Sequence, residues 1–93
     1  MKVTSLEEDG YMYYYRFDID INSLLRYKFC EELTIFLTKN VISEEIFVDF
    51  YDLRFSISIF YNDKKDCLSE KQLISLINTF TSEYFIVDIL SED

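Results

Sequence analysis

Two aspartates separated by one residue come nearest to a catalytic pattern in this sequence. Asp18 and Asp20 lie in a run of alternating apolar residues, and side chains at positions i and i+2 of a strand point to the same face of a sheet. Asp49 or Asp88, across the sheet, could complete an oxygen cage for a hard cation such as Mg²⁺. Such a site would belong to a small Mg²⁺-dependent nuclease or cyclase.

The rest of the composition argues against catalysis. The chain has no histidine, which removes the usual general base, the usual zinc ligand and the imidazole of nucleophilic triads. Gly10 is the single glycine, whereas phosphate-cradling loops need several glycines close together. An Asp-x-Asp pair is also a weak motif in a chain with 18 acidic residues among 93. We therefore expect a protein that is not an enzyme and that binds no metal or cofactor.

The charge balance indicates the kind of partner. Eighteen acidic and nine basic residues give a net charge of -9, which argues against direct binding to nucleic acid or to anionic membranes and favours a basic protein. No run of 18 apolar residues is present, and the first ten residues do not resemble a signal peptide. Cys30 and Cys67 are too few to staple a secreted domain, so we expect free thiols and a cytoplasmic protein.

Hydrophobic periodicity predicts the first half of the fold. Apolar side chains at every odd position of residues 11–21 predict a half-buried strand. A helix is predicted over residues 23–40, capped by Asn22 or Ser23, from the apolar stripe Leu25, Phe29, Leu33, Phe36 and Leu37. The alternation then changes phase between Tyr51 and Arg54, which predicts a hairpin.

The second half continues with a helix and a strand. Residues 62–67 form a polar connection, and Ser69 and Gln72 have the spacing of a capping box. The apolar stripe that follows predicts a helix ending near Glu83. A last strand is expected over residues 85–89.

This order of elements predicts an α+β fold of the ferredoxin-like βαββαβ type. Its antiparallel sheet would carry both helices on one face, with the first and third strands in the centre. Residues 1–93 should form a single domain. The acidic N-terminal segment, residues 1–10, contains an alternative: residues 2–6 could add a short strand through a turn at Glu8, Asp9 and Gly10.

The sheet face away from the helices is the candidate binding surface, because it mixes aromatic side chains with carboxylates. An ordinary solvated sheet face is the plainer interpretation. A homodimer formed through this face or through an edge strand would use the same residues. The predicted partner-binding residues are Tyr14, Asp18, Asp20, Phe47, Asp49, Tyr51, Phe60 and Asp88, together with Glu44 and Glu45 before the second strand.

In size, acidity and lack of catalytic motifs the whole chain resembles phage anti-CRISPR proteins and other DNA-mimicking inhibitors, and equally bacterial immunity proteins and antitoxins. No local motif carries this resemblance. It implies that the protein blocks a basic, nucleic-acid-handling partner by steric and electrostatic occlusion. An immunity protein or antitoxin that neutralises a toxin nuclease is the alternative within the same class.

Overall fold

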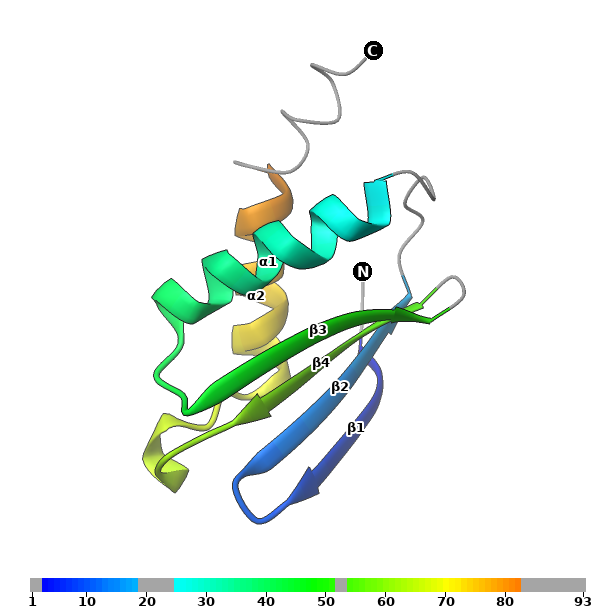
Figure 1. Ribbon diagram of the computed structural model, residues 1–93. Helices are drawn as coiled ribbons and strands as arrows, with labels where there is room; N and C mark the ends of the chain where they lie inside the picture. Colours follow the sequence, from blue (N-terminus) through cyan, green and yellow to red (C-terminus); the bar gives the residue numbers. More distant parts are fainter. Residues whose placement is uncertain (1–2, 19–24, 52–53, 83–93) are drawn as a thin grey trace.

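The fold is α+β, with a four-stranded antiparallel sheet and two α-helices (Figure 1). The computed structural model describes residues 3–18, 25–51 and 54–82. The described strands have the order β1-β2-β4-β3. The elements are β1 (Val3–Asp9), β2 (Met12–Asp18), α1 (Arg26–Asn40), β3 (Glu45–Tyr51), β4 (Arg54–Phe60), the 3₁₀ turn η2 (Lys64–Asp66) and α2 (Glu70–Phe80).

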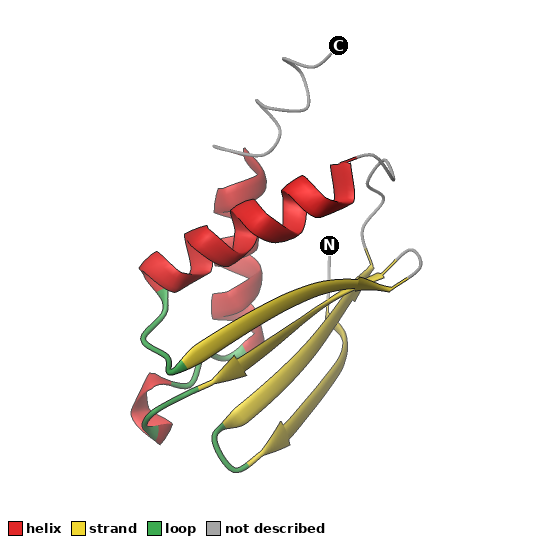
Figure 2. Cartoon of the chain, in the orientation of Figure 1, coloured by secondary structure: helices red, strands yellow, loops and turns green. Residues whose placement is uncertain are grey.

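The core forms where one face of the sheet meets both helices (Figure 2). Alternation along β4 buries Phe55, Ile57 and Ile59 completely, as period two requires of a strand with one covered face. Each helix adds one buried stripe at helical spacing, as predicted. These stripes are Phe29, Leu33 and Leu37 in α1 and Leu73, Ile77 and Phe80 in α2.

Both predicted helices are present, and the capping box of α2 is confirmed. The Ser69 hydroxyl accepts a hydrogen bond from the Gln72 amide at 3.2 Å, and the Ser69 amide donates to the Gln72 side chain at 2.8 Å. Helix α1 begins at Arg26 after Leu25, which forms no side-chain cap. The predicted caps Asn22 and Ser23 lie outside the described residues.

The predicted hairpin is also confirmed, since β3 and β4 pair antiparallel from Glu45 opposite Phe60 to Tyr51 opposite Arg54. Strands β2 and β4 are the central pair, as expected for the first and third strands of the predicted order. The polar connection after β4 contains η2, a single 3₁₀ turn that the sequence analysis did not predict.

The strand order and count differ from the predicted βαββαβ pattern. The extra N-terminal strand is real and longer than expected: β1 pairs with β2, and Gly10 supplies the positive φ of +63° that their two-residue connection needs. Strand β1 therefore occupies the edge beside β2, where the βαββαβ order places its last strand. The predicted last strand, residues 85–89, lies outside the described residues.

Three hydrogen bonds among Tyr15, Tyr61 and Leu68 hold the start of α2 against the sheet. The Tyr15 hydroxyl donates to the Leu68 carbonyl oxygen at 3.1 Å, and the Leu68 amide donates to the Tyr61 hydroxyl at 3.2 Å. The two hydroxyl oxygens are 3.2 Å apart, and Tyr61 supplies the proton between them because that of Tyr15 is already used. In this closed cycle of hydrogen bonds, both hydroxyls and both Leu68 backbone groups have a partner. The two buried tyrosines therefore fix the chain that leads into α2.

Candidate protein-binding surface

The second face of the sheet is not covered by either helix, and the strand register fixes which side chains share it. Residues directly opposite each other in antiparallel strands point to the same side. Three cross-strand rows result. They are Asp9, Met12, Phe60 and Glu45; Tyr14, Ser58 and Phe47; and Arg16, Ser56 and Asp49. These residues, together with Arg54, are called the open face below.

An aromatic pair lies towards the β3 edge of the open face. The rings of Phe47 and Phe60 meet edge to face, with centroids 6.1 Å apart and planes at 87°. Their exposed fractions are 46% and 37%, high for phenylalanine side chains packed on a sheet. Apolar rings of this size, held rigid by their strands, are typical anchors of a protein interface.

Carboxylates from distant parts of the sequence meet at one end of the sheet. Asp9 and Glu45 stand at the two ends of the row that contains Phe60, and Glu44 is held there by its amide, which donates to the Phe60 carbonyl oxygen at 2.7 Å. The turn η2, with Asp63 and Asp66 and the offsetting charges of Lys64 and Lys65, lies at the same end (Figure 2). We call Glu8, Asp9, Glu44, Glu45, Asp63 and Asp66 the acidic end.

Two of these carboxylates already have local partners. Glu8 accepts a hydrogen bond from the Tyr13 hydroxyl, and this bond, with burial as the second cause, raises the pKa of Tyr13 to about 12. Asp63 accepts from the Lys65 amide at 3.2 Å and caps η2. Asp9, Glu44 and Glu45 are exposed, and Glu45 lies directly opposite Phe60 of the aromatic pair.

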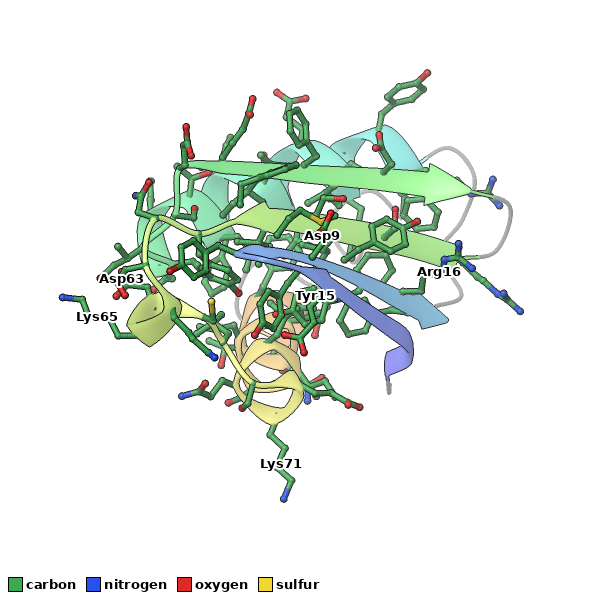
Figure 3. The ribbon with its side chains drawn as sticks, turned by 90° about the horizontal axis from the view of Figure 1, so that it is seen from below. Asp9, Tyr15, Arg16, Asp63, Lys65 and Lys71 are labelled. Atoms are coloured by element: carbon green, nitrogen blue, oxygen red, sulfur yellow. The ribbon has the colours of Figure 1, made fainter. Side chains whose placement is uncertain are left out.

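The opposite end of the open face carries arginine. Figure 3 shows Arg16 and Asp63 at opposite ends of the sheet. The Arg16 guanidinium lies over the Tyr14 ring, 5.4 Å from its centroid. A shallow hollow of about 710 Å³ is bordered here by Tyr14, Arg16, Asp49, Arg54 and Ser56. The open face is therefore polarised rather than uniformly acidic.

The described strands bring most of the predicted partner-binding residues together. Tyr14, Glu45, Phe47, Asp49 and Phe60 share the open face, and Glu44 precedes it at the acidic end.

For the four other predicted partner-binding residues, the structure gives a register position or no position at all. Asp18 and Tyr51 have register positions opposite Arg54, whereas Asp20 and Asp88 lie outside the described residues. Sequence reasoning did not place Arg54 on this face, although it directly precedes the buried Phe55 and alternation alone assigns it there.

Cys30 does not have the environment of an activated nucleophile. Both thiols are free and half-buried. Burial, with a smaller effect of the Asp49 carboxylate, raises the pKa of Cys30 to about 11, which keeps it a neutral packing residue. Among residues 3–18, 25–51 and 54–82, no three or more cysteine, aspartate or glutamate side chains gather in a way that could hold a metal ion.

Comparison with protein-family models, with curated proteins and with solved structures finds no match to this chain. None of the helices in the described ranges combines the length and the apolar character needed to cross a bilayer.

Proposed function

We propose that this chain is a non-enzymatic binding protein that occludes a basic, nucleic-acid-handling protein, in the manner of an anti-CRISPR or DNA-mimicking inhibitor. The observation that carries the proposal is the exposed Phe47 and Phe60 pair with carboxylates on its border. A partner surface rich in lysine and arginine would match that border and bury the rings. The cytoplasm of a host cell is the proposed compartment.

Charge and aromatic surface would contribute to different stages of binding. The net charge of -9 attracts a basic partner over a distance of about one Debye length, roughly 10 Å at 0.1 M salt, and so raises the association rate. The two rings then lose their contact with water and slow dissociation. No bond is made or broken, so the partner is blocked only while the chain is bound.

We further propose that the fold is a variant of the ferredoxin-like arrangement. The segment from β2 to α2 has the order strand, helix, strand, strand, helix of that pattern, with β2 and β4 central. Strand β1 then takes the edge position beside β2. This leaves the open face free of helices, which a binding role requires.

Capture from a nuclease-treated host lysate tests the proposal, because any protein retained cannot be bridged by nucleic acid. The immobilised chain should retain a basic nucleic-acid-binding protein that elutes as salt rises. Phe47→Ser with Phe60→Ser should abolish retention, since each anchor contributes about 2 kcal/mol. Ile42→Ser is the matched control, because Ile42 is 68% exposed but lies outside the open face.

A second pair of variants isolates the charge. Glu44→Lys with Glu45→Lys changes the net charge from -9 to -5, and so does the control Glu32→Lys with Glu70→Lys on the helices. The first pair should weaken capture far more than the second. Equal retention by all variants, or recovery of this chain alone, would refute the proposal.

A further inference from the structure

The outer edge of β3 is a second surface with features of a binding site. Strand β3 pairs only with β4 among the described strands, and no backbone hydrogen bond from its other edge reaches a described residue outside the sheet. An edge of this kind presents a row of backbone donors and acceptors to any strand that can lie beside it.

The two edges of the described sheet differ in how they are protected. Strand β1 has an irregular register between Val3 and Ser5, which discourages pairing with another strand. Strand β3 has a continuous register from Glu45 to Tyr51. Edge β3 is therefore the one open to a further strand.

Helix α1 forms a groove wall beside this edge, and Figure 1 shows it running along β3 on the core side of the sheet. Two hollows of about 500 and 350 Å³ lie between α1 and β3, and both are bordered by Tyr27, Cys30 and Val48. Ile35 borders the second hollow. Tyr27 is 91% exposed and Ile35 is 46% exposed, so large apolar side chains line the groove without being covered by described residues.

The acidic side chains beside the groove favour a basic strand as its occupant. Asp49 belongs to the open face by its register and also borders the larger hollow beside α1, where its carboxylate acts electrostatically on the Cys30 thiol. Glu31 borders the groove from α1. A second copy of this chain would bring another Asp49 and another net charge of -9 to the same edge, which is repulsive. A strand with lysine or arginine would instead neutralise both carboxylates.

One polar atom in the groove has no acceptor within the described chain. The Nε of Arg26, at the start of α1, is buried and makes no hydrogen bond there, while its guanidinium lies 5.5 Å from the centroid of the Phe50 ring. A buried donor without an acceptor is destabilising. Arg26 borders the larger hollow, so among the described lining residues it adds one positive charge beside Asp49.

We infer that the groove between β3 and α1 binds an extended, basic segment of a protein partner as a fifth strand, with apolar side chains in the two hollows and lysine or arginine beside Asp49 and Glu31. Backbone pairing would supply affinity, and the alternation of basic and apolar side chains would supply specificity. The basic character of the partner rests on the proposed function, and the two sites share strand β3: the groove lies on its α1 side, whereas Phe47 of the aromatic pair lies on the open face.

Selection from a randomised linear-peptide display library on the immobilised chain tests this inference. Peptides enriched on the wild-type chain should alternate basic and apolar residues and bind Asp49→Lys at least tenfold more weakly. Glu32→Lys, an equal charge change on an exposed α1 residue that does not border the groove, is the matched control. Binding that survives Asp49→Lys, or a library with no enrichment over that variant, overturns the inference.

Backbone pairing has its own measurement, made with an enriched peptide and the ¹⁵N-labelled chain. The amide shifts that change should map to β3, Tyr27 and Ile35. N-methylation of the peptide amides on its pairing edge should weaken binding at least tenfold, and methylation on its other edge should not. Shifts confined to the open-face residues of β2 and β4, or β3 shifts that depend on protein concentration without peptide, contradict an added peptide strand.

The two proposals can fail separately. Loss of lysate capture in the Phe47 and Phe60 variant, with no peptide at β3, leaves the proposed function and removes this inference. Peptide binding at β3 with no basic protein retained from lysate leaves this inference and removes the proposed function.

Discussion

The Tyr15 hydroxyl is one of the two buried hydroxyls that join the sheet to the start of helix α2. It connects β2 to the Tyr61 hydroxyl and to the Leu68 carbonyl oxygen, and its side chain is fully buried. A phenylalanine in its place would keep the ring packing but leave the Leu68 carbonyl without this donor. At this scale, the joint between β2, β4 and the start of α2 depends on hydrogen bonds that satisfy the two buried hydroxyls.

Tyr15→Phe should lower the free energy of unfolding by about 1–3 kcal/mol, because it leaves buried partners unsatisfied. Tyr27→Phe removes the same atom from a side chain that is 91% exposed and should change stability by less than about 0.5 kcal/mol. Urea unfolding of both variants measures the difference. Equal midpoints would show that the buried ring of hydrogen bonds contributes nothing.

The same tyrosines predict how stability depends on alkaline pH. Burial raises the pKa of Tyr15 and of Tyr61, and the Glu8 carboxylate raises that of Tyr13 from 10.0 to about 12. The folded state therefore favours the protonated phenols, so this stabilisation is complete below pH 10 and is lost as pH rises through the folded pKa values.

Thermal unfolding should show a falling midpoint above about pH 10, the ordinary tyrosine pKa. Ultraviolet titration of tyrosinate should show a late fraction that ionises only at about pH 12 or on unfolding. Glu8→Gln should shift the Tyr13 part of that fraction to lower pH, because it removes the negative charge. A titration unchanged by this substitution would contradict the assigned cause.

At the scale of elements, β1 is the strand whose place depends most on one residue. Gly10 adopts a φ of +63°, and a Cβ built there would meet no heavy atom within 4 Å. Substitution therefore affects the backbone conformation and not the packing. The hairpin of β1 and β2 is therefore the part of the sheet that a substitution at Gly10 should destabilise.

Gly10→Ala should destabilise the chain by about 1–2 kcal/mol, the cost of a left-handed conformation for an L-residue with a Cβ. Gly10→Asn should cost less, because asparagine tolerates that region better than alanine. Hydrogen exchange of the β1 amides, read beside those of β4, measures the effect locally. Equal exchange in the two variants would show that the φ of residue 10 does not control this hairpin.

At the scale of the whole molecule, the net charge of -9 opposes the compact state. The acidic end concentrates part of this repulsion where β1, β3 and η2 meet. The acidic end is thus a source of electrostatic repulsion within the protein, and neutralising it should stabilise the fold.

Raising NaCl from about 0.01 to about 1 M shortens the Debye length from about 30 to about 3 Å, so the melting temperature should rise. Glu44→Gln with Glu45→Gln reduces the net charge from -9 to -7 and should flatten this dependence. Glu32→Gln with Glu70→Gln, the same charge change on the helices, should flatten it less. Differential scanning calorimetry across the salt series provides the measurement, and a melting temperature that falls with salt would refute the repulsion argument.

The sequence by itself determined the features that depend on neighbours along the chain. Period two predicted the buried face of β2 and β4, helical spacing predicted the stripes of α1 and α2, and the Ser69 and Gln72 spacing predicted a cap that forms as expected. The phase change near residue 52 located the β3 and β4 hairpin. Each is local, so one segment carries the whole signal.

Only the tertiary structure decided what lies beside what. Strand β1 and any distant strand compete for the same edge of β2, and the two-residue connection at Gly10 closes at far lower entropic cost than a long loop. The acidic end and the arginine-bordered hollow arise because the register aligns residues that are scattered along the chain. Sequence periodicity assigns a side chain to one face of the sheet. Strand pairing decides which side chains lie next to it on that face, and a surface patch depends on these cross-strand neighbours.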